Sequence, residues 1–275
     1  MARLRQEYLT GEHAKWSGLT EGWRKGDNGS LAEYLVKYGV WHQLALGERD
    51  KAERRLFDLG YMAALCGATD LVTSLRYWRV LGLTRADAGF LRVAADGEPD
   101  SLDASTVGIF LEESGLYQSA EALLRAALRI DGQQLGPEHP VTMMSANNLG
   151  TLLWAKGDYG GAEVMYRRAL AGKEKAFGPQ HPESLSSANN LGTLLSDKSH
   201  CEAAEELFSR ALAGYERAFG PEHPDTLMVV GNLGNLLQDL NSTLFLLTTL
   251  SRQCLDLLLH PDSTGVSSTS GDSHV

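Results

Sequence analysis

Three histidines are the first candidates for chemistry in this chain. His139, His181 and His223 each precede a proline, and successive copies are 42 residues apart. Histidine is a common metal ligand, but helices packed side by side lie about 8–10 Å apart. Zinc ligands lie only about 2.0–2.3 Å from the metal, so neighbouring histidines cannot share one ion. We interpret them instead as residues that satisfy the backbone groups at helix starts.

No other residues form a set typical of catalysis. His200, Cys201 and Glu202 are adjacent in the sequence, but no third group can be named that would orient them. Cys254 lies in an apolar helical stretch, where it is expected in the core. The phosphate-binding pattern GxxxxGK[ST], an acid pair and a nucleophile elbow are all missing from the sequence. The sequence therefore predicts a protein that is not an enzyme and needs no cofactor or metal.

Composition indicates a globular intracellular protein. The 275 residues are 43% hydrophobic, enough for a core. The only cysteines, Cys66, Cys201 and Cys254, are too few and scattered for a disulfide framework, so reduced thiols are expected. The first residues lack the apolar core of a signal peptide, and the apolar run Leu244 to Leu250 is too short to span a membrane. We predict a cytoplasmic location.

The negative charge lies in the second part of the chain. Residues 1–100 hold 14 Lys+Arg and 14 Asp+Glu, whereas residues 101–275 hold 11 and 21, which accounts for the whole net charge of −10. An acidic surface repels phosphate groups, so nucleic acid and anionic membranes are not expected as partners. Neutral or basic protein segments are favoured. A solvated surface without a partner explains the charge equally well.

The elements that position these residues repeat with a period of 42. Residues 136–140 (GPEHP) return as GPQHP at 178–182 and unchanged at 220–224, and residues 146–153 (ANNLGTLL) return unchanged at 188–195. Residues 120–128, 162–170 and 204–212 form a third repeated block, which begins with Ala-Glu each time. A fixed period of this length is typical of a solenoid or array.

Each unit is predicted to contain two helices. In the second unit the first helix begins at Pro140, because proline suits the first helical turn, and continues to Ala155. A turn around Gly157 leads to the second helix, from Tyr159 to Ala176, which ends before Gly178. Small residues at fixed offsets face large ones, as in closely packed helix pairs. The packing residues predicted in this way are Gly150, Ala162, Tyr166, Ala169, Gly192, Ala204, Phe208 and Ala211.

These residues resemble the tetratricopeptide repeat. Leu149-Gly150, Leu153, Ala162, Tyr166 and Ala169 carry the resemblance, although that repeat usually has a period of 34. The 42-residue period, with NNLG in the first helix and GPEHP between units, resembles the kinesin light chain and nephrocystin-3 type. The resemblance implies an all-α, right-handed solenoid of helix-turn-helix units.

It also implies a binding groove lined by the first helices. An amide side chain offers a donor and an acceptor to a peptide backbone, and amides 8–10 Å apart would meet an extended peptide at roughly every third residue. Alternatively, one asparagine of each Asn-Asn pair braces the neighbouring unit and the other faces water. The residues expected in the groove are Asn147, Thr151, Asn189, Thr193 and Asn235.

The resulting organisation has five parts. We predict a helical lead-in over residues 1–95, a linker over 96–100 and about 3.5 repeats over 101–239. A degenerate capping helix over 240–260 and a disordered tail over 261–275 follow.

The expected function is a non-catalytic scaffold that binds a peptide or protein segment. One alternative is a fragment or regulatory relative of a nephrocystin-3-like signal-transduction NTPase, because residues 31–65 resemble the helical segment before the repeats of such proteins. The other alternative is a cargo adaptor similar to a kinesin light chain. The sequence does not indicate an oligomeric state.

Overall fold

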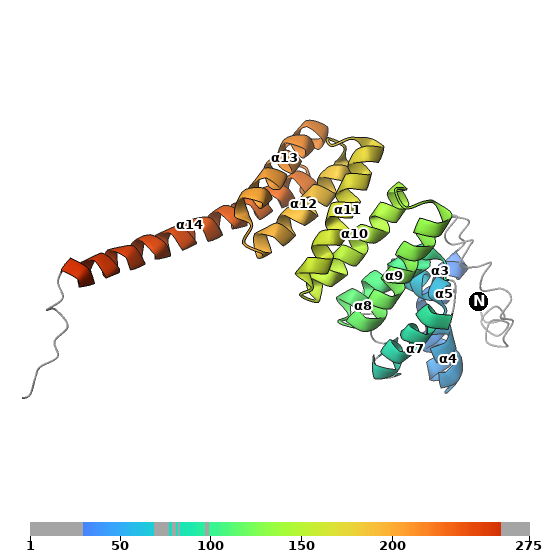
Figure 1. Ribbon diagram of the computed structural model, residues 1–275. Coiled ribbons are helices and arrows are strands. Elements are labelled where there is room, and N and C mark those ends of the chain that lie inside the picture. The colour runs from blue at the N-terminus through green and yellow to red at the C-terminus, as the bar shows by residue number, and fades with distance from the viewer. Residues whose placement is uncertain (1–29, 69–76, 79–80, 82, 97–98, 260–275) are drawn as a thin grey trace, which may run out of the picture.

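Every element of the computed structural model is an α-helix within the residues that it describes, 30–68, 77–78, 81, 83–96 and 99–259 (Figure 1). The predicted all-α solenoid of helix-turn-helix repeats behind a helical segment is confirmed. The first 29 residues and the predicted tail lie outside the described residues. The helices are α3 (Ser30–Ala45), α4 (Arg49–Leu56), α5 (Leu59–Ala68), α7 (Leu83–Asp96), α8 (Ser101–Glu113), α9 (Tyr117–Gln134), α10 (Pro140–Ala155), α11 (Tyr159–Phe177), α12 (Pro182–Asp197), α13 (Cys201–Phe219) and α14 (Pro224–Leu259).

The repeats are three helix pairs and a further first helix. The pairs are α8 with α9, α10 with α11, and α12 with α13, and each second helix also packs against the first helix of the next unit. The histidines lie at the starts of the first helices. The Nδ1 atom of His139 accepts from the backbone N–H of Val141 at 3.3 Å, and His181 and His223 make the same bond at 3.2 Å. The structure thus places them in the role that their spacing indicated.

The turns inside the units share one backbone conformation. Gly115, Gly157 and Ser199 occupy the same place in the three pairs and have φ values of 78°, 82° and 62°. Positive φ favours glycine, and Ser199 adopts it with a side chain. The next position in this series is Asn241, which lies inside α14. The boundary predicted at residue 240 therefore falls within a continuous helix.

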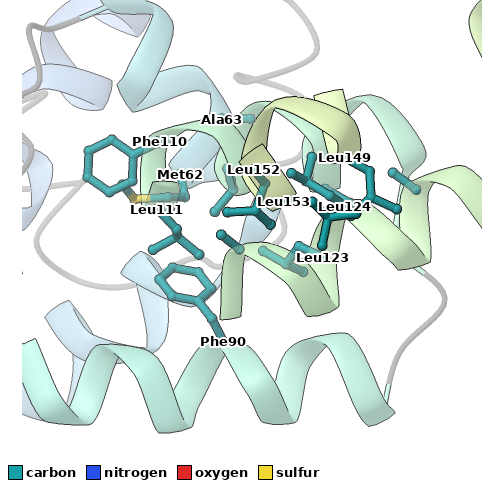
Figure 2. Packing of buried hydrophobic residues seen from close by; sticks show 14 of the residues in the cluster. Met62, Ala63, Phe90, Phe110, Leu111, Leu123, Leu124, Leu149, Leu152 and Leu153 are labelled. Atoms are coloured by element: carbon teal, nitrogen blue, oxygen red, sulfur yellow. The ribbon is translucent and has the colours of Figure 1, made fainter. Parts of the chain in front are cut away.

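The helical lead-in packs directly on the first repeat. Helix α5 contacts α8, and α7 contacts α9. Figure 2 shows Met62 and Phe90 of the lead-in in the same cluster of buried residues as Phe110 and Leu111 of α8. The carboxylate of Asp87 accepts from the hydroxyl of Ser119 at 2.6 Å, which ties α7 to α9. One core therefore runs from the lead-in into the repeats.

Candidate functional site

The small residues of the repeats lie where helices approach closely. A Cβ atom added to Gly150 would lie 2.8 Å from the ring of Tyr166, and one added to Gly192 would lie 2.8 Å from the ring of Phe208. The four alanines of the second helices are fully buried, with 0% exposure at Ala162, Ala169, Ala204 and Ala211. These close contacts position the first helix of each unit. The face of the first helices that does not pack against the second helices carries the candidate site.

The asparagines link successive first helices. The Oδ1 atom of Asn147 accepts from Nδ2 of Asn190 at 3.1 Å, and Oδ1 of Asn189 accepts from Nδ2 of Asn232 at 3.0 Å. Asn189 is 3% exposed, and Asn147 is half-buried. The bonds join α10 to α12 and α12 to α14, which is the bracing role considered for these residues. Their contact with a bound peptide stays a prediction.

The two threonines one turn further on also make contacts within the protein. The hydroxyl of Thr151 donates to the carbonyl oxygen of Asn147 at 3.3 Å and accepts from the hydroxyl of Tyr166 at 3.0 Å. Thr193 donates to the carbonyl oxygen of Asn189 at 3.1 Å. Both threonines remain partly exposed. Asn235, the last residue predicted for the groove, is exposed on α14.

A tryptophan that the sequence interpretation did not single out lies between the second and third units. The indole Nε1 of Trp154, near the end of α10, donates to the carboxylate of Asp197 at the end of α12 at 2.6 Å. Trp154 is half-buried and is the only tryptophan in residues 101–275. The other units have no tryptophan at the equivalent position, and this difference was the one signal in the sequence. A search for residues that repeat from unit to unit does not find it.

A cleft opens at the same place one unit later. The residue 42 positions after Trp154 is Ser196, and the residue 42 positions after Asp197 is Asp239. With serine in place of the indole, a cleft of about 400 Å³ lies between α12 and α14. It includes Thr193 and Asn235 from the predicted groove, whereas Asn147, Thr151 and Asn189 do not line it. The lining residues are Thr193, Ser196, Asp197, Phe208, Asn232, Asn235, Gln238 and Asp239.

The lining of this cleft is polar and acidic. Two carboxylates, three amides and two hydroxyls line it, and none of its lining residues is basic. Arginine binds carboxylates through several N–H groups at once, and tryptophan donates through its indole. Phe208 adds an aromatic surface.

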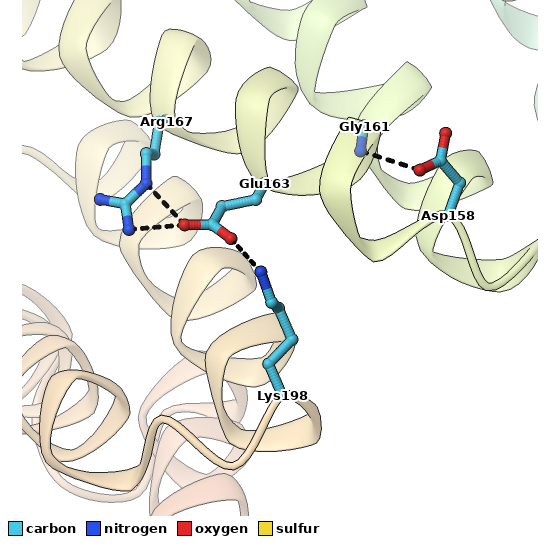
Figure 3. A network of polar contacts seen from close by, with 5 residues as sticks. All are labelled: Asp158, Gly161, Glu163, Arg167 and Lys198. Atoms are coloured by element: carbon cyan, nitrogen blue, oxygen red, sulfur yellow. Dashed lines mark hydrogen bonds and ion pairs between the residues drawn. The ribbon is translucent and has the colours of Figure 1, made fainter.

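Several basic residues elsewhere in the repeats pair with acids. The carboxylate of Glu163 on α11 accepts from Arg167 at 2.7 Å and from Lys198 at the end of α12 (Figure 3). The hydrogen bonds from Lys198 and Arg167 lower the pKa of Glu163. Forty-two residues earlier, Glu121 pairs in the same way with Arg125 and Lys156. This network joins α9 to α10 and α11 to α12, and none of its residues lines the cleft.

Two other kinds of site are missing from the described part of the chain. No group of three or more His, Cys, Asp and Glu side chains suited to a metal ion occurs among its residues. None of the helices in that part combines the length and the apolar character needed to cross a membrane. Cys66 and Cys201 are free thiols, and burial raises the pKa of Cys66 to about 12.

Comparison with solved structures finds similar helical arrays at low sequence identity. The crystal structure of BtubC (BKLC) from P. vanneervenii has a TM-score of 0.50 and 18% identity, covering 86% of this chain and 98% of that one. A putative kinesin light chain from Podospora anserina, with nearly identical TPR-like repeats, gives a TM-score of 0.48 and 21% identity, covering 69% and 93%. A point mutant of that same protein gives 0.49 and 20%, covering 68% and 92%.

Family models match the repeat part of the sequence. No curated protein matches the chain. One tetratricopeptide repeat model matches residues 101–175, and a second matches residues 184–225. These ranges contain the three helix pairs with their buried glycines and alanines. These matches identify residues 101–175 and 184–225 of the chain as tetratricopeptide repeats.

Proposed function

We propose that this chain is a non-catalytic scaffold that binds a protein or peptide segment along the first helices of its repeats. Solenoids of this kind present extended concave surfaces on which partners bind. The cleft between α12 and α14 is the anchor point of that surface. The observation that carries the proposal is that this cleft lies where Trp154 sits one unit earlier.

The side chain of Trp154 indicates which kind of partner side chain fits the cleft. Its planar indole fills the place between α10 and α12 and donates an N–H to Asp197. In the next unit, Ser196 leaves that place open, and Asp239 takes the position of Asp197. A partner side chain that is planar and donates N–H fits the same place. Because two carboxylates line this cleft, arginine is favoured over tryptophan.

The amide and hydroxyl groups beside the cleft extend the surface. Asn235 and Gln238 are exposed on α14 and line the cleft with Thr193. Amides can bind both N–H and C=O groups of an extended peptide. A neutral or basic peptide therefore anchors one planar side chain in the cleft and runs along the first helices towards Thr151 and Asn147.

Selection from a random peptide library displayed on phage tests this function. Wild-type full-length protein is expected to enrich peptides that share an arginine or a tryptophan. The variant Ser196→Trp fills the cleft with the side chain of the preceding unit and is expected to lose those peptides. Ser209→Trp, at an exposed position on α13, is the control and should retain them. Retention of the same peptides by Ser196→Trp would exclude the cleft as the anchor.

Two narrower functions rest on the resemblance of the sequence. The 42-residue period supports a cargo adaptor similar to a kinesin light chain, and residues 31–65 support a regulatory relative of a nephrocystin-3-like NTPase. Sequencing the gene upstream of Met1 tests the second alternative, because an in-frame GxxxxGK[ST] motif would support it. We further propose a reducing cytoplasmic location, supported by the two free thiols.

A further inference from the structure

The last described helix carries an uncovered apolar face. Leu227, Val230 and Leu237 on α14 are 54%, 46% and 47% exposed. Gly234 lies among them at helical spacing, and a Cβ atom added there would meet nothing within 4 Å. Exposed apolar residues that are contiguous on one face mark an interaction surface.

The repeat register shows what normally covers this face. Forty-two residues earlier, Leu185, Ala188, Gly192 and Leu195 occupy the same positions on α12, and α13 covers them. Leu185 and Ala188 are 0% exposed, and Leu195 is 2% exposed. A Cβ atom at Gly192 would lie 2.8 Å from Phe208 of α13. The uncovered face of α14 therefore corresponds to the surface on which the second helix of a unit packs.

The sequence contains a segment that corresponds to the second helix expected on this surface. Residues 243–259 stand 42 positions after residues 201–217 of α13. Leu246, Leu250 and Leu257 take the positions of the buried residues Ala204, Phe208 and Tyr215. In the structure this segment continues α14 in a straight line past the other helices (Figure 1). A straight helix cannot fold onto its own side, so the segment cannot cover the face of its own chain.

We propose that a second copy of the chain covers this face, and that the two copies exchange their C-terminal segments. Residues 243–259 of each copy lie on Leu227, Val230, Gly234 and Leu237 of the other. Each copy has one uncovered face and one segment. In a two-fold dimer each segment covers the face of the other copy, so no uncovered face remains and the assembly is closed. The exchange completes the fourth repeat in both copies while α14 stays continuous. This inference rests on the repeat register and not on the proposed peptide binding.

The competing arrangement is a monomer in which the segment folds back on its own chain. That arrangement needs α14 to break at Asn241, the position of the positive-φ residues in the other turns. Asparagine adopts positive φ more readily than most residues, so the turn is chemically accessible. The structure instead continues the helix through Asn241 to Leu259, which favours exchange between copies.

Sedimentation velocity of the full-length protein over a wide concentration range tests the exchange. The wild type is expected to form a concentration-dependent dimer. Leu237→Asp places a charge in the proposed interface and should raise the dimer dissociation constant at least about a hundredfold. Leu240→Asp is the matched control, because Leu240 is also an exposed apolar residue of α14, at 36%, but corresponds to Lys198, whose side chain pairs with Glu163 of α11 and not with α13. It should leave the dissociation constant within about threefold.

A second pair of variants tests the other half of the interface. Leu250→Asp should weaken the dimer as Leu237→Asp does, whereas Ser251→Asp, equivalent to the exposed Ser209, should leave it intact. Circular dichroism checks that each variant keeps its helices. A wild-type monomer at all concentrations would overturn the proposal. A dimer insensitive to Leu237→Asp, or one sensitive to Leu237→Asp but not to Leu250→Asp, would also overturn it.

Discussion

The amide nitrogen of Asn190 donates to the amide oxygen of Asn147 at 3.1 Å, and Asn232 repeats this bond to Asn189 one unit later at 3.0 Å. These bonds cross the gap between successive first helices. Asparagine is mildly unfavourable within helices. The hydrogen bond between units offsets this cost, which explains why asparagine recurs at these positions. The same bonds fix the spacing of the helices that carry the proposed binding surface.

Removing the buried asparagine should weaken the array. Asn189→Ala deletes the acceptor for Asn232 at a site that is 3% exposed. We expect the free energy of unfolding to fall by about 1–2 kcal/mol, measured by urea denaturation. Asn235→Ala removes an exposed amide and should change it by less than about 0.5 kcal/mol. Equal effects of the two variants would show that the bond between units contributes nothing to stability.

Adding one methyl group to two glycines of first helices should have opposite effects. In Gly192→Ala the new Cβ lies 2.8 Å from Phe208, so overpacking should cost about 1–3 kcal/mol. In Gly231→Ala the new Cβ meets nothing within 4 Å, and the gain in helix propensity should stabilise by about 0.5–1 kcal/mol. Thermal and urea unfolding measure both changes. Stabilisation by Gly192→Ala would contradict the close approach of α12 and α13.

The ion pair between Lys173 and Glu183 should make stability depend on pH. Nζ of the buried Lys173 lies 2.8 Å from the carboxylate of Glu183, and this hydrogen bond lowers the pKa of Glu183. A lowered pKa means that the stabilisation is present above the ordinary glutamate pKa and is lost as the pH falls through the folded value. Glu183→Gln should therefore destabilise the protein at neutral pH by up to about 1 kcal/mol.

Unfolding measured from neutral to acidic pH checks this dependence. The difference between wild type and Glu183→Gln should shrink as the pH falls, because protonation removes the charge from the wild-type carboxylate. Glu222→Gln, an exposed substitution, is the control and should differ little from wild type. A Glu183→Gln deficit that stays constant down to acidic pH would show that the ion pair is not its cause.

The buried hydroxyl of Tyr166 gives a spectroscopic prediction at alkaline pH. Burial raises the pKa of Tyr166 to about 12, so the stability that its protonated form provides is present below the ordinary tyrosine pKa. It should be lost as the pH rises towards 12. In a tyrosinate absorbance titration, Tyr166→Phe should remove a late-titrating component. Loss of a component near the ordinary tyrosine pKa would contradict the burial of this side chain.

The repeated residues explain why the solenoid could be predicted from sequence. Pro140, Gly157 and Gly178 mark helix starts and ends by local conformational preference, and their 42-residue spacing fixes the order of the helices. The small glycine and alanine residues recur at the same 42-residue spacing, so they also indicated where helices pack closely. Asn241 shows the limit of this reasoning. It tolerates both a turn and a helix, and the structure has a helix there.

Features that differ between units could not be predicted in this way. The bond from Trp154 to Asp197 joins residues 43 positions apart, and its importance lies in the change to Ser196 in the next unit. The packing of the lead-in on α8 and α9 depends on tertiary contacts between sequences without a shared period. Repetition therefore revealed the scaffold, and the departures from repetition mark the candidate site.

The number of peptide-binding sites measured by isothermal titration calorimetry tests the central claim most directly. A peptide selected on the wild type is expected to bind at one site per chain. Ser196→Trp fills the cleft and should leave no site, whereas Ser209→Trp, at an exposed position on α13, should keep one site. One site of unchanged affinity in both variants would contradict the account.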